Sequence, residues 1–285
     1  MPRILVVGRT GQLGTALAAG LPATGWPFSI LEAPELDLTD PASIDAAIAA
    51  TRPEVVINAA AYTAVDAAEK NRELAYAINA TGPGLLAAAA ARAGAAILHV
   101  STDYVFDGSR GPWREDDSPA PLGVYGASKL AGEQAVAAAN PCHLIIRTSW
   151  VCSATGQNFL RTMLRLAETR DELRVVADQQ GAPTFADDLA DAVIRLVPRL
   201  AAGEGLGLFH LTGTPWTTWH GFAEAILAGL PVRVLPITTA EYPTPARRPA
   251  DGRLDCGRIT AVHGIAPADW RLGLRRAMAR LSGPG

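Results

Sequence analysis

The sequence has few cysteines and no long apolar run. Cysteine occurs three times, without C-x-x-C spacing, which favours reduced thiols packed in the interior over a disulfide framework. No uninterrupted apolar segment approaches the ~18 residues that a membrane span needs. The opening segment MPRILVVG lacks the long apolar region of a signal peptide. We therefore expect no membrane association and a cytoplasmic location.

An excess of positive charge is also missing. The formal net charge is −3 and the pI is near 6.0, so no field would attract nucleic acid or anionic lipid. Histidine and cysteine do not recur at metal-ligand spacing, and we expect no metal site. The 285 residues, 49% of them hydrophobic, suffice for one large α/β domain with an appendage.

Lysine is almost absent, which makes one of the two lysines informative. Lys70 and Lys129 stand among 25 basic residues, and Lys129 follows Tyr125 by four positions, a spacing that stacks both side chains on one helix face. A nearby ammonium would lower the ordinary tyrosine pKa of ~10. Thr102, after the apolar run 96–100, could hold a carbonyl oxygen beside the phenol. The alternative is a chance pair on a surface helix, but the scarcity of lysine favours a carbonyl reductase.

A glycine-rich loop follows the first apolar strand. Gly8, Gly11 and Gly14 stand between the strand Arg3–Val7 and an alanine-rich helix to Leu21. Such glycines let the backbone turn tightly beneath a pyrophosphate, and the helix N-terminus offers free N–H groups. The GxxGxxG spacing differs from the common GxGxxG, so an ordinary glycine-rich turn is the alternative. The context predicts a dinucleotide cradle.

The next strand ends indicate which cofactor binds there. Glu32, after the strand Phe28–Leu31, could accept from ribose hydroxyls, which favours NADH, whereas Arg9 could meet the 2′-phosphate of NADPH. Both nicotinamides therefore stay open. Asp37 and Leu38 are expected near the adenine. The small residues Ala59, Ala60 and Ala61, after the strand 53–58, are expected to form the cofactor wall.

The alternation of strands and helices predicts the fold. Helices 66–80 and 82–93 between apolar strands indicate a Rossmann-like, doubly wound parallel sheet of the α/β class. Beyond Arg147 we expect a helix at 157–169, a strand at 173–176 and a helix at 187–200. The predicted dinucleotide-binding domain is 1–149 with 184–204. A smaller C-terminal α+β substrate lobe takes 150–183 and 205–285. We expect Trp216 and Trp219 in the core of this lobe, with a stack on the thymine of the nucleotide as the alternative, and we expect His99 in the core.

Several motifs in order carry a resemblance. GRTGQLG (8–14), NAAA (58–61), STDYVFDG (101–108) and YGASKL (125–130) resemble the extended short-chain dehydrogenase/reductase superfamily. Within it, the chain is similar to the dTDP-4-dehydrorhamnose reductase family, through RTSW (147–150), GQNF (156–159), DQQGAPT (178–184) and YPTPARRP (242–249). The resemblance covers nearly the whole length.

The resemblance implies a reaction and a set of roles. The C4 ketone of dTDP-4-dehydrorhamnose would be reduced with NADPH or NADH to dTDP-L-rhamnose, for surface polysaccharide. The resemblance is also compatible with a homodimer. Tyr125 would donate the proton, Lys129 would bind the nicotinamide ribose, and Thr102 would touch the sugar. The other implied cofactor contacts are Gly11, Gln12, Leu13, Asp37, Leu38, Ala61, Tyr62 and Thr63, and the other implied substrate contacts are Asp103, Tyr104, Trp150 and Asn158.

One further substrate contact is expected on charge alone. The loop 242–255 carries Arg248, whose forked guanidinium suits a diphosphate. The alternative is an ordinary solvated loop charge.

Three other functions fit the same residues less well. A 4,6-dehydratase needs a glutamate after Asp103, where this chain has Tyr104, so elimination of water is disfavoured. An epimerase would use the same Tyr125 and Lys129. A non-catalytic regulatory subunit of this fold is the third alternative, and the retention of Thr102, Tyr125 and Lys129 together argues against it.

Overall fold

Parallel strands form the centre of the molecule. The computed structural model describes residues 1–282. Within them a six-stranded sheet has the order β10-β5-β4-β3-β1-β2, and each strand runs parallel to its neighbours. The predicted Rossmann-like α/β fold is confirmed. The strands are β1 (Ile4–Val7), β2 (Phe28–Leu31), β3 (Val55–Asn58), β4 (Ala96–Thr102), β5 (His143–Thr148) and β10 (Gly207–His210).

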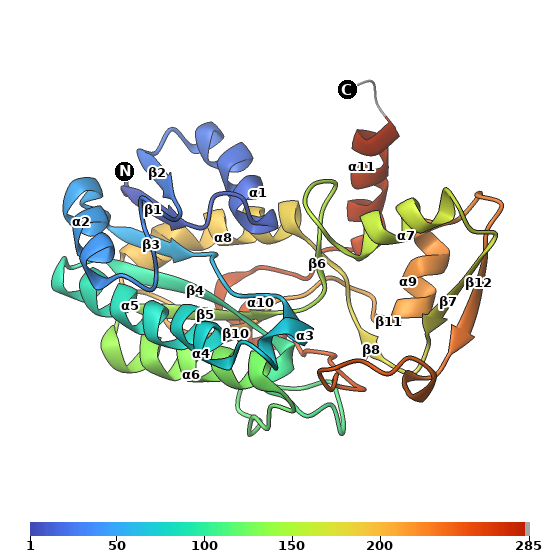
Figure 1. The fold of residues 1–285 in the computed structure, drawn as a ribbon. Coiled ribbons are helices and arrows are strands. Elements are labelled where there is room, and N and C mark those ends of the chain that lie inside the picture. The colour runs from blue at the N-terminus through green and yellow to red at the C-terminus, as the bar shows by residue number, and fades with distance from the viewer. Residues whose placement is uncertain (283–285) are drawn as a thin grey trace.

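Helices cover both faces of this sheet because its inner strands are apolar on both sides. Leu17 of α1 and Val193 of α8 pack in the core of one face, and Ile44, Leu86 and Val136 pack in the core of the other. Figure 1 shows α4, α5 and α6 together along the lower side of the sheet. The helical elements around the sheet are α1 (Gln12–Gly20), η1 (Leu21–Thr24), α2 (Pro41–Thr51), α3 (Val65–Ala68), α4 (Arg72–Tyr76), η2 (Ala77–Thr81), α5 (Gly82–Arg92), η3 (Asp103–Val105), α6 (Val124–Ala139), α8 (Ala186–Ala201) and α10 (Gly257–His263).

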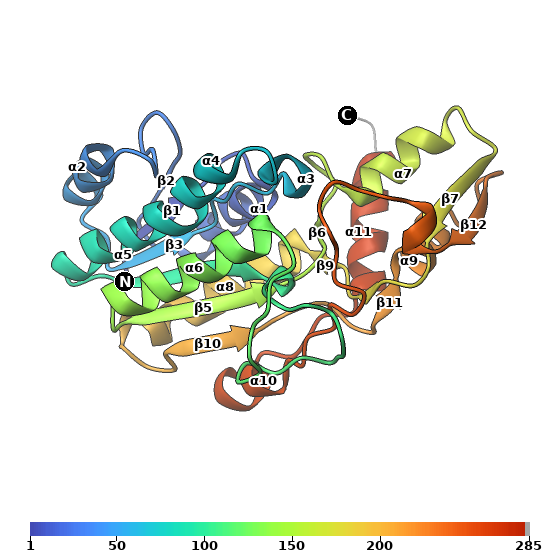
Figure 2. The same ribbon diagram turned by 60° about the horizontal axis from the view of Figure 1, so that its bottom comes forward.

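A smaller lobe lies beside the carboxyl ends of β4 and β5 (Figures 1 and 2). Its own core includes Leu160, Phe222, Ile226 and Trp270. The predicted helices 157–169 and 187–200 and the strand 173–176 are present as α7, α8 and β7, within two residues at each end. The elements of the smaller lobe, and the short strands that join it to the sheet, are β6 (Val151–Cys152), α7 (Phe159–Ala167), β7 (Glu172–Val176), β8 (Gln180–Gly181), β9 (Thr184–Phe185), β11 (Thr217–Thr218), α9 (Trp219–Ile226), β12 (Arg233–Ile237), η4 (Thr239–Glu241) and α11 (Trp270–Ser282).

One part of the predicted domain division differs from the structure. Residues 205–285 were assigned to the substrate lobe, but β10 forms the edge of the main sheet beside β5. Ile259 of α10 packs in the same core as Phe209 of β10. A four-residue apolar strand looks the same in sequence whichever sheet it joins. The rest of the division stays a prediction, and residues 283–285 lie outside the described part.

The helices predicted at 66–80 and 82–93 are also divided differently. Residues Arg72–Arg92 form one helical run, in which the wide turn η2 precedes Pro83. Such a π turn accommodates a proline, which has no N–H to donate. Among the described residues, this run alone has the length and mean hydropathy of a membrane span, and half of it is buried. It contacts α2 and α6, and packing between two helices requires the same apolar composition.

Candidate active site

A cleft of about 700 Å³ opens at the carboxyl ends of the central strands. Strand register places Val7 level with Asn58, and Thr102 level with Thr148. Segments that leave parallel strands therefore reach the same edge of the sheet, where such folds bind ligands. The predicted residues that line this cleft are Gly8, Gly11, Gln12, Leu13, Glu32, Ala59, Ala60, Ala61, Thr63, Thr102, Asp103, Tyr104, Tyr125, Lys129 and Trp150.

The glycine loop has the close packing that a phosphate cradle requires. Gly8 has φ +101°, a left-handed conformation that favours glycine. A Cβ on Gly14 would lie 1.8 Å from the carbonyl oxygen of Gly8, so α1 begins directly against the loop. Gly11, at the N-cap of α1, has no side chain to occupy the first N–H groups of the helix. These donors are free for an anion, and the loop fits a dinucleotide pyrophosphate.

Glu32 faces the cleft but is already held by the same loop. One of its carboxylate oxygens accepts from the backbone N–H and the hydroxyl of Thr10, both at 2.9 Å, and from Arg9 N–H at 3.1 Å. The hydrogen bonds from Thr10 are the main cause that lowers the pKa of Glu32. The Arg9 guanidinium donates to Ile30 O at 2.9 Å and pairs with Glu35 at 3.2 Å. Glu32 and Arg9, the two residues expected to decide between NADH and NADPH, therefore both have partners within the protein.

The three predicted catalytic side chains share one wall of the cleft. Thr102 ends β4, and Tyr125 and Lys129 lie one turn apart on α6. The Tyr125 ring meets Tyr104 edge-on, with 5.4 Å between centroids. Burial raises the pKa of Tyr125 to about 12, against the lowering effect of the nearby Thr102 hydroxyl. The prediction that Lys129 draws this pKa down is therefore wrong for this structure.

Lys129 points to the floor of the cleft instead. It is 1% exposed, and its Nζ donates to Val100 O at 2.7 Å and lies 3.3 Å from His99 Nε2. Burial lowers the pKa of Lys129 to about 8, and Glu133 one turn further along α6 raises it. Glu133 is itself bound by both ends of the Arg147 guanidinium fork at 2.9 and 2.6 Å. A buried ion pair therefore lies behind the lysine.

Asp103 is a buried acid at the mouth of this wall. Its Oδ1 accepts from the Thr102 hydroxyl at 3.0 Å, and the residue is 2% exposed. Burial raises the pKa of Asp103 to about 7. The residue predicted to contact the sugar can therefore change its protonation near neutral pH.

Two tryptophans form the opposite side of the cleft. The Trp150 and Trp219 rings stack with 3.6 Å between centroids and 13° between planes. Trp150 has φ +47°, a strained backbone conformation of the kind that recurs at functional sites. Trp219 packs against the core of the smaller lobe, as predicted, and it also lines the cleft. Trp216 is 46% exposed, so its predicted place in the core is wrong. His99 has the buried position expected.

Several predicted contacts lie behind the cleft surface rather than on it. Gly14 sits beneath the loop, as its contact with Gly8 shows. Leu38 is buried next to Gly82. Asp37 binds the backbone N–H of Thr39 at 2.8 Å and its hydroxyl at 2.7 Å, which closes a local turn. Asp37 and Leu38 are therefore not among the cleft-lining residues, and their contact with adenine stays a prediction.

Two of the predicted cofactor and substrate side chains have taken structural partners. The Asn158 side chain caps α7 through Arg161 N–H at 3.1 Å and donates to Gln12 Oε1 at 2.9 Å. The Tyr62 hydroxyl accepts from Asn71 at 3.2 Å. These side chains are not in the cleft lining, because partners from other elements draw them away.

Arg248 has also found a partner. Its guanidinium binds both oxygens of Asp66, at 3.1 and 2.9 Å. Burial alone would lower the pKa of Arg248, but the hydrogen bonds that it donates to the Asp66 carboxylate, with the charges around it, raise this pKa overall. The predicted phosphate ligand is thus already neutralised by a carboxylate. Neither of the two interpretations of this arginine, phosphate ligand or solvated charge, includes such a pair.

Among the cleft residues that sequence reasoning missed, two carry hydroxyls at strand ends. Ser101 and Thr148 line the cleft at the ends of β4 and β5. Their buried hydroxyls have no hydrogen-bond partner within residues 1–282. Buried hydroxyls normally have partners, so these two are suited to a bound ligand. Their places at strand ends were the signal that could have identified them.

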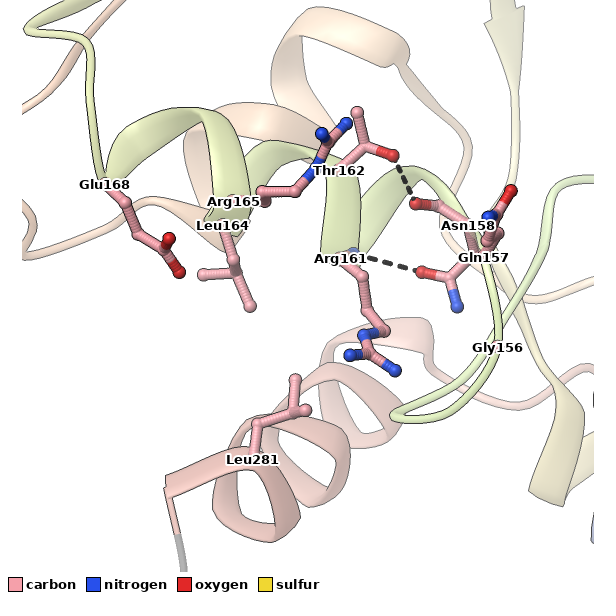
Figure 3. A pocket seen from close by; sticks show the side chains of 9 residues that line it. All are labelled: Gly156, Gln157, Asn158, Arg161, Thr162, Leu164, Arg165, Glu168 and Leu281. Carbon is pink, nitrogen blue, oxygen red and sulfur yellow. Dashed lines mark hydrogen bonds between the residues drawn. The ribbon is translucent and has the colours of Figure 1, made fainter.

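A second hollow, of about 950 Å³, lies between α7 and the end of α11. Figure 3 shows Arg161 pointing into it, towards Leu281. It shares Gly156 and Gln157 with the cleft but contains neither Thr102, Tyr125 nor Lys129. The chemistry is therefore concentrated in the smaller cleft. Within residues 1–282, no group of three His, Cys, Asp or Glu side chains is arranged to hold a metal ion.

Comparisons with known proteins agree with this geometry. Residues 2–282 match the family model described as RmlD substrate binding domain. A dTDP-4-dehydrorhamnose reductase of Sinorhizobium fredii is 44% identical over 96% of both chains. A crystal structure of a dTDP-4-dehydrorhamnose reductase from Clostridium acetobutylicum has a TM-score of 0.94 at 39% identity, over 99% of this chain and all of that one. The enzyme of that name from Bacillus anthracis, in complex with NADP, has a TM-score of 0.93 at 37% identity, over 98% and 99% of the two chains.

Proposed function

The chain belongs to the RmlD substrate binding domain family, and we propose that it reduces the C4 ketone of dTDP-4-dehydrorhamnose to dTDP-L-rhamnose with NADPH or NADH. One observation carries the proposal: a single cleft brings the glycine cradle together with Thr102, Tyr125 and Lys129. The relatives that cover nearly the whole chain bear the name of this enzyme. We place the reaction in the cytoplasm. Its product would serve the synthesis of surface polysaccharide.

The cofactor side of the proposal rests on fit. Gly8 and Gly14 let α1 start against the loop, and the free N–H groups at Gly11 face the cleft. The small side chains of Ala59 and Ala61 leave space for the cofactor along the adjoining wall. When bound, the nicotinamide supplies the hydride that adds to C4 of the sugar. We assign the ribose hydroxyls to Lys129 and Glu32, the two charged groups on this part of the lining.

The proton side of the proposal rests on Tyr125. Its pKa of about 12 keeps the phenol protonated at neutral pH, which a proton donor requires. An alkoxide is a much stronger base, because the conjugate alcohol has a pKa near that of water, ~15.7. Transfer from Tyr125 to the new alkoxide is therefore downhill. Thr102 holds the sugar oxygen beside the phenol.

The base is assigned to the opposite wall, and the sugar is assigned to the end of the cleft beside Thr102. The stacked rings of Trp150 and Trp219 offer a flat face to the nucleotide. Asp103 and Tyr104 lie beside Thr102 at the sugar end. Arg248 could serve the diphosphate only by sharing its fork with Asp66. We also assign substrate binding to the smaller lobe. Asn158 would act on the substrate side indirectly, through its hydrogen bond to Gln12.

Dehydration is disfavoured by Tyr104, whereas an epimerase, which would use the same Tyr125 and Lys129, is the alternative. Solved structures of a UDP-glucose 4-epimerase and a dTDP-glucose 4,6-dehydratase match at 21% and 20% identity, which supports the fold alone. Tyr104, with a pKa that burial raises far above the working range, is a poor base for removing a proton from a sugar. Reduction needs no such base.

The test measures nicotinamide oxidation with the keto sugar nucleotide, for the wild type and for Tyr125→Phe. We expect turnover in the wild type, and a loss of about 10²–10⁴-fold in kcat for the variant with unchanged NADPH affinity. Tyr76→Phe, a tyrosine outside the cleft lining, is the matched control and should retain full activity. Absence of turnover in the wild type with both nicotinamides would overturn the proposal. Full turnover by Tyr125→Phe would remove the assigned proton donor.

A further inference from the structure

A buried line of polar side chains connects the cofactor wall to Lys129. The backbone N–H of Ala60 donates to Asn58 Oδ1 at 3.2 Å. Asn58 Nδ2 lies 3.0 Å from His99 Nδ1, and His99 Nε2 lies 3.3 Å from Lys129 Nζ. Asn58 and His99 are fully buried. Core packing alone needs neither side chain, because an apolar residue would fill the same space.

The hydrogen bond from Ala60 decides the direction of the whole line. A backbone N–H only donates, so the atom of Asn58 beside it must be the oxygen and the amide NH₂ must face His99. Nδ1 of His99 is then an acceptor. Burial and the nearby Lys129 lower the pKa of His99 well below its ordinary value, so the ring is neutral. Its one proton therefore sits on Nε2.

That proton points at the lysine. Nε2–H can make a hydrogen bond with Nζ only if Nζ offers a lone pair, as a neutral amine does. An ammonium would instead present hydrogen to hydrogen. Nζ already donates to Val100 O at 2.7 Å, which leaves its lone pair free for the imidazole. The fixed tautomer thus favours the neutral form of Lys129.

We propose that Asn58 and His99 are positioning residues that set the protonation of Lys129 through this tautomer. The inference rests on the proposed function, in which Lys129 works beside Tyr125. After Tyr125 has given its proton to the sugar alkoxide, the phenolate must be recharged. Lys129 does this in its ammonium form: one ammonium N–H bond breaks, the tyrosine O–H bond re-forms, and the neutral amine that remains takes a proton from solvent. Such exchange needs a lysine that titrates near the working pH.

Other charged groups around Lys129 leave this role to His99. Tyr125 and Glu133 lie on the same helix, Asp103 follows β4, and Arg147 lies on β5. Glu133 favours the ammonium but is bound by Arg147 at 2.6 Å. Burial keeps Tyr125 and Asp103 inclined to their neutral forms. At His99, one substitution can replace the N–H that faces Nζ of Lys129 with an acceptor.

The scarcity of lysine makes the test direct. Lysine labelled with ¹³C at Cε gives two signals, from exposed Lys70 and buried Lys129, and Lys70→Arg leaves one. In the wild type the Lys129 signal should titrate near pH 8, in keeping with the pKa of about 8. His99→Gln presents an amide oxygen to Nζ without adding charge. We expect it to raise the midpoint by about one pH unit.

A second variant reverses the line itself. In Asn58→Asp the carboxylate accepts from both Ala60 N–H and the ring, which moves the imidazole proton to Nδ1 and turns Nε2 into an acceptor. We expect a rise of about two pH units, part of it from the new charge. His143→Gln replaces a partly buried histidine that lies outside the cleft lining. This control should leave the midpoint unchanged.

A measurement on the wild type guards against variants that do not fold. A long-range ¹H–¹⁵N spectrum should show His99 with a bare Nδ1 and a protonated Nε2. The opposite tautomer, or a midpoint unmoved in His99→Gln, would overturn the inference. None of these readouts requires turnover, so failure of the proposed reaction is a separate result. In an active enzyme, the fall of kcat/KM at high pH should move upward in both variants.

Discussion

The two walls of the cleft are built from different materials. The cofactor wall consists of backbone that leaves parallel strands, such as Gly8–Gly14 and Ala59–Ala61. The opposite wall consists of long side chains, such as Trp150 and Trp219, brought together from distant parts of the chain. Parallel strands deliver their ends to one edge whatever the surrounding sequence. Long side chains go where their best partner lies, and only the fold determines that partner.

The largest expected effect concerns Asp103, at the meeting of the walls. Its folded pKa of about 7 lies above the ordinary 3.8. The native state therefore binds the proton more tightly, and this stability is present below pH ~4 and lost as pH rises through ~7. In Asp103→Asn that loss disappears. Urea unfolding should show the variant gaining, relative to wild type, on the order of 4 kcal/mol between pH 4 and pH 7.

Asp107→Asn is the control for this prediction. The hydrogen bond from Ser109 lowers the pKa of Asp107, so its stabilising effect is lost as pH falls, the opposite trend. If the unfolding free energies of Asp103→Asn and the wild type changed in parallel from pH 4 to 7, burial would not raise the pKa of Asp103.

The next effect tests the backbone wall. In Gly14→Ala the new Cβ would lie 1.8 Å from Gly8 O, whereas a Cβ on Gly11 meets nothing within 4 Å. Relief of the overlap must move the loop or α1. We expect Gly14→Ala to lower the free energy of unfolding by about 1–3 kcal/mol and to weaken NADPH binding measured by calorimetry. Gly11→Ala should change the stability by less than about 1 kcal/mol, and equal losses would contradict the close-packing argument.

A smaller effect belongs to the side-chain wall. Trp219→Ala removes one ring of the stack with Trp150. We expect a loss of about 0.5–1.5 kcal/mol in binding of dTDP, roughly 2- to 12-fold in Kd, with NADPH affinity unchanged. Trp216→Ala, at an exposed tryptophan, is the matched control. Loss of NADPH affinity in Trp219→Ala would show that the walls are not separate.

The last effect, similar in size, concerns the hydrogen bonds that join Gln12 of α1 to the segment 153–158. Gln12 Oε1 accepts from Asn158 at 2.9 Å and from Ser153 at 3.1 Å. In a double-mutant cycle of Gln12→Ala and Asn158→Ala, we expect a coupling of about 0.5–1.5 kcal/mol in unfolding free energy. Asn158→Ala alone also removes the cap of α7, which the cycle subtracts. A coupling of zero would mean that the hydrogen bond between Gln12 and Asn158 does not hold the segment 153–158 against α1.

The sequence was sufficient where a local rule governs the structure. The strand–glycine–helix order placed Gly8, Gly11 and Gly14 beneath one cradle, and the i, i+4 spacing placed Tyr125 and Lys129 on one helix face. It was insufficient for the direction of each side chain. The Nζ atom of Lys129 turns to Val100 O and the histidine, so burial, rather than the lysine, decides the pKa of Tyr125.

The sequence by itself determined the parallel sheet, the cleft at its carboxyl edge and the reactive groups that reach it, because strand period, glycine spacing and helix period are properties of neighbouring residues. Tertiary structure alone decided that Arg248 binds Asp66, that Asn158 binds Gln12 and that β10 completes the main sheet. Those choices depend on which partner is nearest after folding. A hydrogen bond or ion pair in a buried site is made with whatever group the packed elements bring within about 3 Å.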